Sequence, residues 1–170
     1  MGLAPPSRVA APRLVPRKAE PHMSPSTQYV VFSIDAQRYA LPLANVQRTV
    51  RMVALVPLPE APPSVLGVVN VQGEVVPVVD TRRCFHLPER EPRLDDQLIL
   101  VRVSGRTLAL VADAVHGVIE PAPEKIVGAD RILPGLDQLR GAAKLEDGMV
   151  LIHDLEQIDK EVTLRVAART

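Results

Sequence analysis

The chain has 170 residues, with one cysteine, no tryptophan and 2% aromatic residues. Its 20 basic and 20 acidic residues cancel, so it has no long-range attraction for phosphate backbones and few side chains on which bases can stack. We therefore expect no nucleic-acid partner. A single cysteine excludes an intramolecular disulfide and a cysteine-based zinc site, while 46% apolar residues suffice for the core of one domain.

Prolines set the first segment of the chain apart. Six of the 17 prolines lie in residues 1–25, together with a net charge of +3. Because proline fixes φ and lacks an N–H donor, we predict a disordered, proline-rich extension over residues 1–26. Two interpretations of it stay open, an inert tail and a basic contact to acidic lipid or a partner, and Met23 is an alternative start.

No apolar run is long enough for a secretory signal or a transmembrane helix. We therefore expect a cytoplasmic protein without direct membrane insertion.

Short runs of β-branched and apolar residues, separated by turn residues, follow along the rest of the chain. They predict strands at 29–34, 38–43, 54–58, 67–71, 74–79, 97–103, 106–112, 114–119, 141–145 and 148–153. Few helices separate them, so the sheets should be mostly antiparallel.

The predicted helical elements are short. Pro62 and Pro63 are expected to open a helical turn, because proline is tolerated in a first turn. Asp80 should cap a brief helix over 81–85, and residue 154 should begin a C-terminal helix with a capping box.

Two polar segments complete the prediction. Residues 90–95 are expected to form a polar connector, with Asp95 and Asp96 in a solvated turn. Residues 161–170 are expected to form a C-terminal tail.

The order of these elements repeats along the chain. A shift of 69 places the first predicted hairpin on 98–110, and a shift of 74 places Gly67 on Gly141 and Asp80 on Asp154. This predicts an internal duplication, with subdomains at about 27–95 and 96–155. Five short strands hide their edges best in a small barrel, so we expect two similar five-stranded β-barrels packed together, with a groove between them.

The sequence shows no catalytic constellation. Cys84 and His86 lie two residues apart on a short turn, where their side chains diverge, so Cys84 is interpreted as a core residue. The four histidines lack metal-ligand spacing, His153 is interpreted as satisfied or exposed, and no glycine-rich phosphate loop is present. We expect no enzyme, no cofactor and no metal site; a small ligand-binding β-barrel remains an alternative.

Residues 67–80 read Gly-Val-Val-Asn-Val-Gln-Gly-Glu-Val-Val-Pro-Val-Val-Asp. This stretch resembles the signature of the CheW-like family, Gly-x-x-Asn-Leu-Arg-Gly-x-x-x-Pro-x-x-Asp. The opening hairpin, the pair Val46-Gln47 and the block 141–154 also resemble this family, so that the resemblance covers about residues 27–160. It implies a mostly β fold of two SH3-like barrels and a non-catalytic adaptor without cofactors.

The resemblance also implies partners. The family couples the cytoplasmic tip of a methyl-accepting chemoreceptor to the regulatory domain of a CheA-type histidine kinase, and its domains assemble into rings. A module that sequesters a partner without activating a kinase remains an alternative within the family.

The family's binding residues carry over position by position. The implied receptor groove contains Val46, Gln47, Arg48, Gln72, Val115 and Val118. The implied kinase contacts are Leu66, Gly67, Val68, Ile126, Arg131, Ile132 and Leu133. Each apolar position has a second interpretation as part of the core.

Two positions depart from the family pattern. Arg48 stands where many members have an acidic residue, and Gln72 stands where they have arginine. We expect Arg48 to donate a hydrogen bond to the Gln72 side-chain carbonyl in place of the family's ion pair. The exchange suggests an adaptor for a divergent, non-flagellar array.

Overall fold

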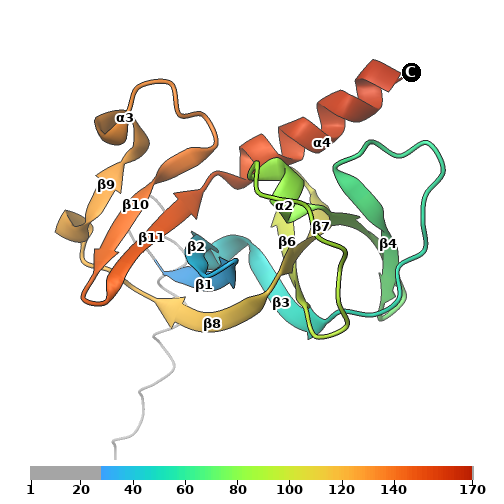
Figure 1. Cartoon of the computed structure of the whole chain (residues 1–170), viewed down its shortest axis with the longest axis horizontal. Coiled ribbons are helices and arrows are strands. Elements are labelled where there is room, and N and C mark those ends of the chain that lie inside the picture. Colours follow the sequence, from blue (N-terminus) through green and yellow to red (C-terminus); the bar gives the residue numbers. More distant parts are fainter. Residues whose placement is uncertain (1–27, 170) are drawn as a thin grey trace, which may run out of the picture.

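The computed structural model describes residues 28–169, with the side chains of residues 28–163. The predicted disorder of residues 1–26 and the alternative start at Met23 lie outside the described residues. The structure is mostly β, as expected, with short helices and one long C-terminal helix (Figure 1). The elements are β1 (Tyr29–Ile34), β2 (Gln37–Pro42), η3 (Leu43–Asn45), β3 (Val46–Arg51), β4 (Val65–Val71), β5 (Glu74–Val79), α2 (Thr81–Cys84), β6 (Gln97–Val103), β7 (Arg106–Ala112), β8 (Ala114–Ile119), η4 (Pro123–Lys125), β9 (Ile126–Gly128), α3 (Ala129–Ile132), β10 (Leu139–Leu145), β11 (Gly148–His153) and α4 (Leu155–Arg169).

The strands form two sheets. Sheet A has the order β8-β1-β2-β11-β10-β9, and sheet B has the order β3-β6-β7-β5-β4. Neighbouring strands are antiparallel except at the two central pairs, β2 with β11 and β5 with β7. Sheet A has one strand more than expected, because the three-residue strand β9 adds to β10.

Tight two-residue turns connect the predicted hairpins. Both turn residues have positive φ at Asp35 and Ala36 (54° and 70°), and again at Ser104 and Gly105 (54° and 79°). Such turns match the right-handed twist of the strands they join. Gln72-Gly73 is a third turn of this kind, so the local sequence determines where these hairpins fold back.

The two sheets have the same strand order once the duplicated strands are matched. Strands β1, β2 and β3 correspond to β6, β7 and β8, and β4 and β5 correspond to β10 and β11. Sheet A therefore takes one hairpin from the first half of the chain and four strands from the second half, and sheet B takes one hairpin from the second half and three strands from the first half. The boundary predicted between 27–95 and 96–155 does not separate the sheets, because the halves exchange their first hairpins.

Two glycines at equivalent positions make the same close backbone contact in the two duplicated units. A Cβ atom on Gly67 would lie 2.6 Å from the carbonyl oxygen of Val56, and one on Gly141 would collide with the carbonyl oxygen of Val127. Both glycines follow a register shift in their strand pair. Each duplicated unit thus needs glycine where a neighbouring backbone crosses the strand.

Several predicted element bounds are wrong. Residues 54–58 do not form a strand: only Val56 pairs, in a single bridge to Val68, and the third strand is β3. The segment at Pro62 is a turn closed by the Val65 N–H on the Pro62 carbonyl (2.9 Å), and no helix forms there. The tail expected from residue 161 is helical, because α4 continues to Arg169.

Both predicted helix caps form, but the capping box expected at residue 154 does not, because the Asp154 N–H donates to the Gln138 carbonyl (3.0 Å) instead of the Gln157 side chain. The Asp80 carboxylate accepts from the Arg83 N–H (3.2 Å), and the Asp154 carboxylate accepts from the Glu156 N–H (3.0 Å). A side-chain oxygen at this position satisfies a backbone donor that the helix leaves free.

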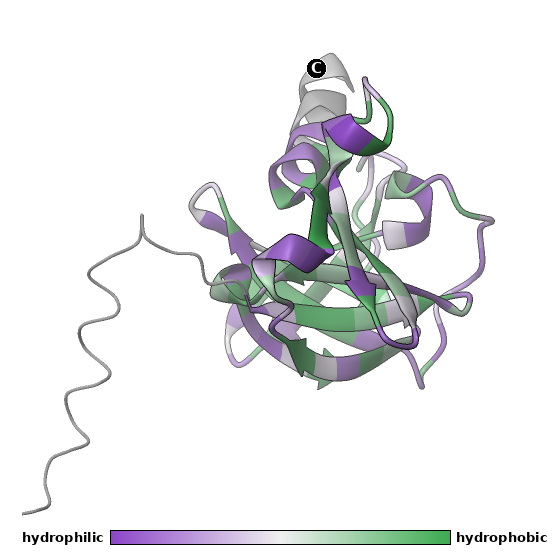
Figure 2. Cartoon of the chain, turned by 90° about the vertical axis from the view of Figure 1, so that its left-hand side faces the viewer, coloured by the Kyte–Doolittle hydropathy of each residue, from purple (hydrophilic) through white to green (hydrophobic). Residues whose placement is uncertain are grey.

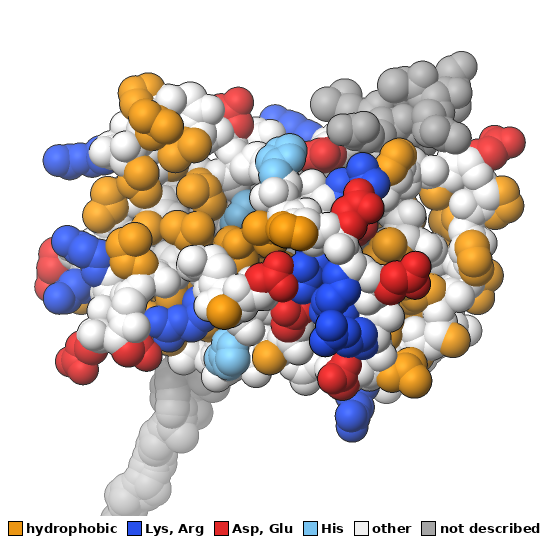
Figure 3. All heavy atoms as spheres, viewed as in Figure 1, with side chains coloured by type: hydrophobic (Ala, Val, Ile, Leu, Met, Phe, Trp, Pro, Cys, Tyr) orange, Lys and Arg blue, Asp and Glu red, His pale blue; other side chains and the backbone are white. Residues whose placement is uncertain are grey.

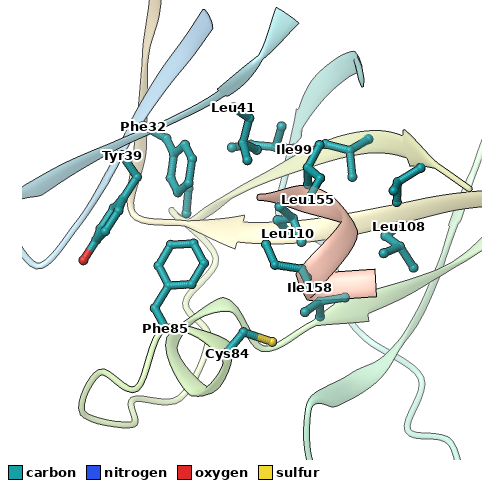
Figure 4. Close-up of a cluster of buried hydrophobic side chains, with 14 of the residues drawn as sticks. Phe32, Tyr39, Leu41, Cys84, Phe85, Ile99, Leu108, Leu110, Leu155 and Ile158 are labelled. Carbon is teal, nitrogen blue, oxygen red and sulfur yellow. The ribbon is translucent and has the colours of Figure 1, made fainter. Parts of the chain in front are cut away.

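One hydrophobic core joins the two sheets. Phe32 and Leu41 reach into it from sheet A, Ile99 from sheet B and Leu155 from α4, all at most 4% exposed (Figure 4). The strands seen in Figure 2 carry alternating hydrophobic and hydrophilic bands, as half-buried strands should. Because each sheet contributes one wall, neither half of the chain encloses this core alone.

A cluster of charged side chains lies beside this core. Arg82 of α2 binds Asp35 in the β1–β2 turn (2.8 Å) and Asp113 between β7 and β8 (3.2 Å). Arg90 binds the same Asp113 (2.7 Å) and Asp96 (2.9 Å). Asp96 is only 3% exposed, so the solvated turn predicted for it is wrong. We call these five residues the Arg82 cluster.

Hydrogen bonds keep the cluster charged. The Asp35 carboxylate raises the pKa of Arg82, and the Asp96 carboxylate raises that of Arg90. Burial alone would raise the pKa of Asp113, but the Asp35 N–H and both arginines hold it below its usual value. The cluster therefore ties the exchanged hairpin to α2 and to the β7–β8 connection.

Replacing Arg82 with methionine leaves Asp35 without its counter-charge and leaves Asp113 paired with Arg90 alone. We expect Arg82→Met to lower the free energy of unfolding by about 3 kcal/mol, measured by urea denaturation. Arg83→Met removes an exposed pair with Glu89 and should change it by less than about 1 kcal/mol. Equal losses in the two variants would show that the Arg82 cluster does not hold the sheets together.

Candidate protein-interaction surfaces

The residues predicted for the receptor groove lie on the edge strands β3 and β8, except for Gln72 in the β4–β5 turn. Val46 and Val115 occupy equivalent places and are half-buried against the shared core. Val118 is 51% exposed, so it is free to contact a partner. The structure thus brings Val46 and Val115 to the same core and leaves Val118 at the surface.

The edge strands also carry equivalent bulges. The pairing of β3 with β6 shifts at Gln47, and that of β8 with β1 shifts at His116. Both bulged residues are exposed. A bulge twists an edge strand and turns its side chain outward, which discourages pairing with a further strand.

The predicted contact between Arg48 and Gln72 is confirmed. The Arg48 guanidinium donates to the Gln72 side-chain oxygen at 2.6 Å and so joins β3 to the β4–β5 turn. Both side chains are exposed. The bond leaves the charge of Arg48 without a carboxylate partner among the described residues.

The seven predicted kinase contacts form two separate patches. Leu66, Gly67 and Val68 lie on β4, at one edge of sheet B. The other four lie at the edge of sheet A, in β9, in α3 and just after it: Ile126, Arg131, Ile132 and Leu133. Ile132 and Leu133 are 46% and 58% exposed, whereas Gly67 is buried.

Further exposed apolar side chains were not assigned to a site from the sequence. Val53, Val56 and Leu58 lie in the crossing segment before β4, Val75 on β5 and Met149 on β11. Val56 and Leu58 fall in the segment 54–58, which was predicted as a strand because of its apolar pattern. Exposed apolar side chains of this kind indicate a contact surface. Their exposure is known from the structure and could not be deduced from the sequence.

A pocket formed by strands of sheet A and the end of α2 was not predicted from the sequence. A cavity of about 480 Å³ opens between β2, the end of α2, the segment before β10 and β11. We call it the aromatic pocket; its lining residues include Tyr39, Phe85, Leu136, Leu151 and His153. The sequence offered little signal, since these residues are far apart along the chain.

His153 is neither exposed nor satisfied, contrary to the prediction. It is 5% exposed and its Nδ1 atom has no hydrogen-bond partner. Its ring stacks on Phe85 with 3.5 Å between the ring centroids and an angle of 6°. Burial lowers the pKa of His153 to about 4, so the ring is neutral at physiological pH.

The remaining candidate groups were Cys84, the potential metal ligands and the helices. Cys84 is 2% exposed within the shared core, as predicted. Among the described residues, no three histidine, cysteine or carboxylate side chains converge in a way that would hold a metal ion. The described helices include none that is long and apolar enough to span a membrane.

Comparisons with known proteins agree with the fold and with the family resemblance of residues 67–80. The model of the CheW-like domain matches residues 28–162, so the chain belongs to the CheW-like family. The chain is 28% identical over 141 residues to the chemotaxis protein CheW of Helicobacter pylori, which covers 79% of this chain and 82% of that protein. It is 25% identical over 133 residues to CheW of Rhizobium meliloti, which covers 77% and 86% of the two chains.

A solved structure shows the same fold. The scaffolding protein TtCheW from Thermoanaerobacter tengcongensis superposes with a TM-score of 0.71 at 29% identity, and the match covers 79% of this chain and 92% of that one. Together these relatives place the chain in a family of non-catalytic chemotaxis scaffolds.

The burial of His153 makes stability depend on pH. In the unfolded chain the His153 ring has a pKa near 6.5. In the folded chain its pKa is about 4, so between these pH values only the unfolded chain binds the proton. The native state should therefore lose up to about 3 kcal/mol as pH falls from 6.5 to 4, and His153→Leu should flatten this slope in urea denaturation.

His86 provides the matched control. It is exposed and has a positive φ of 61°, which asparagine tolerates. His86→Asn should keep the pH slope of the wild-type chain. An unchanged slope in His153→Leu would mean that His153 has the same pKa in the folded and unfolded chain, contrary to its burial.

Proposed function

We propose that this protein is an adaptor that couples the cytoplasmic tip of a methyl-accepting chemoreceptor to the regulatory domain of a CheA-type histidine kinase. The observation that carries the proposal is the presence of separate apolar contact surfaces on a CheW-like fold. Val118 marks one on β8, and Ile132 and Leu133 mark another beside α3. An adaptor needs such separation because its partners must bind at the same time.

The two surfaces suit different partners. A receptor tip is a helical hairpin, which binds apolar side chains set between polar ones. Edge strand β8 offers Val118 and the half-buried Val115 beside the exposed His116. The kinase domain belongs to the same family, so its edges should pair with the corresponding edges of this chain at β4 and at β9–α3. Alternating pairs of this kind close into rings.

The protein acts in this scheme by position alone. It supplies no nucleophile, metal or cofactor to the kinase, and its place in the cell is the cytoplasm, held at receptor arrays through its partners. A module that sequesters kinase or receptor makes the same contacts but does not raise kinase activity.

Ile132 is the residue with which to test the kinase contact. Isothermal titration of the full chain against the kinase regulatory domain should give micromolar affinity, and Ile132→Asp should weaken it at least about tenfold because a carboxylate would be buried. Leu94→Asp is the control: it places the same charge at an exposed apolar residue outside both surfaces.

The variants separate three outcomes. Loss only in Ile132→Asp supports a kinase face beside α3. Wild-type affinity in Ile132→Asp would move that face elsewhere, with β4 the next surface to test. A wild-type chain that binds no CheA-type kinase of its own organism would contradict the coupling function.

The Arg48–Gln72 pair supports a divergent array. We propose that this chain serves receptors of a non-flagellar system, because its groove carries a cation where the family's motif carries an acid. Titration against receptor tips from both kinds of system should favour the non-flagellar tips, and Arg48→Glu combined with Gln72→Arg should reduce that preference. Equal binding of the wild-type chain to both kinds of tip would contradict a divergent role.

A further inference from the structure

The aromatic pocket is lined by two of the chain's four tyrosine and phenylalanine side chains, and a third packs beside them. The whole sequence holds two tyrosines and two phenylalanines, and three of these four, Phe32, Tyr39 and Phe85, pack together next to His153. Tyr39 and Phe85 lie 4.9 Å apart between ring centroids, and Tyr39 meets the His153 ring at 5.4 Å. Tyr39, Phe85 and His153 all line the cavity of about 480 Å³.

The pocket's polarity restricts what can fill it. Leu136, Leu139 and Leu151 complete its apolar walls, and the buried ring of His153 is neutral. Among the described residues, no lysine or arginine lines the pocket, and the exposed Asp137 is the one carboxylate in the lining. The pocket therefore suits rigid apolar groups from a segment that also carries positive charge.

The first 27 residues of the same chain have this composition. They hold six prolines and a net charge of +3, whereas residues 28–170 carry a net charge of −3. Residues 12–18 combine Pro12 and Pro16 with three of the four basic side chains of the segment. Proline-rich chains readily adopt the polyproline II helix, which docks in grooves lined by aromatic residues.

The attachment point lies near the pocket. The Leu43 N–H donates to the Gln28 carbonyl at 2.8 Å, so Gln28 lies beside the end of β2. Tyr39 is four residues back along that strand, about 13 Å away at 3.3 Å per residue. A segment of 27 residues spans at most about 90 Å, so its prolines have ample length to return to the pocket.

The surface beside the pocket is apolar too. Figure 3 shows hydrophobic side chains gathered over the half of this face that contains β9, β10, β11 and α3. Ile132 and Leu133 are exposed there, directly before the segment that lines the pocket. A segment that binds in the pocket would therefore also lie against apolar side chains next to it, and not against charged ones.

We propose that the proline-rich segment 1–27 binds in the aromatic pocket of its own chain, with Pro12 and Pro16 against Tyr39 and Phe85 and its basic side chains towards Asp137. Binding within one chain needs no high intrinsic affinity, because the linker keeps the segment at high effective concentration. The contact would cover the small parts of Tyr39 and Phe85 that line the pocket, since these side chains are 5% and 9% exposed.

Paramagnetic relaxation on the full chain tests this directly. Ala19→Cys supplies an attachment site for a spin label, and the native Cys84 is 2% exposed and so protected from labelling. Methyl spectra should show strong loss of intensity for Leu136, Leu139 and Leu151 of the pocket. The exposed Leu94, which does not line the pocket, should keep its intensity.

Two comparisons make the result specific. Replacing Pro12 and Pro16 with serine in the labelled chain should restore the pocket methyl signals, and high salt should leave the broadening of the original chain largely in place. Three results would overturn the proposal: no broadening at the pocket, equal broadening at Leu94, or broadening that survives the serine replacements. Broadening that disappears in salt would also overturn it, since unspecific charge attraction would then suffice.

Discussion

The exchange of the first hairpin between the two duplicated halves is the constraint on which the rest of the structure depends. Hairpin β1–β2 belongs to sheet A with β8, β10 and β11, and hairpin β6–β7 belongs to sheet B with β3, β4 and β5. Neither half can complete a sheet without the other. A chain built in this way is expected to fold and unfold as one unit, although its sequence repeats like two domains.

The shared core and the Arg82 cluster follow from this exchange. Because β1–β2 crosses to the other half, Phe32 and Leu41 meet Ile99 and Leu155 in one apolar core. The exchange of hairpin β1–β2 also places Asp35 beside Arg82. The ion pairs of the Arg82 cluster neutralise these partly buried charges. With the two sheets fixed in this way, the outer edge strands keep constant positions relative to each other, as a protein that holds two partners in register requires.

The sequence predicted the local structure well. Alternating apolar residues and turn dipeptides placed most strands within one or two residues, and the repeated spacing predicted the duplication. The exchange itself could not be predicted, because each strand has the same local pattern whichever half it joins. Strand β3 was not predicted because it is mostly exposed, with only Val46 and Val50 half-buried. Residues 54–58 were predicted as a strand because they are apolar, but the segment contains a proline and pairs at a single residue.

The candidate sites were predictable only where a motif marked them. The family resemblance indicated Arg48 and Gln72, and their hydrogen bond follows from the two side chains alone. The burial of Asp96 and His153 could not be predicted, because it depends on residues such as Arg90 and Phe85 brought there by the fold. The separation of the kinase contacts into two patches likewise depends on the sheet order.

The measurement that tests the central claim most directly is reconstitution of kinase control. The receptor's cytoplasmic hairpin, the CheA-type kinase and this chain would be combined on liposomes, and kinase autophosphorylation would be followed with and without the chain. A coupling adaptor predicts that receptor-dependent activity appears only when the chain is present. Activity that is unchanged by the chain, or that falls as the chain is added, would contradict coupling, and the fall would indicate a sequestering module.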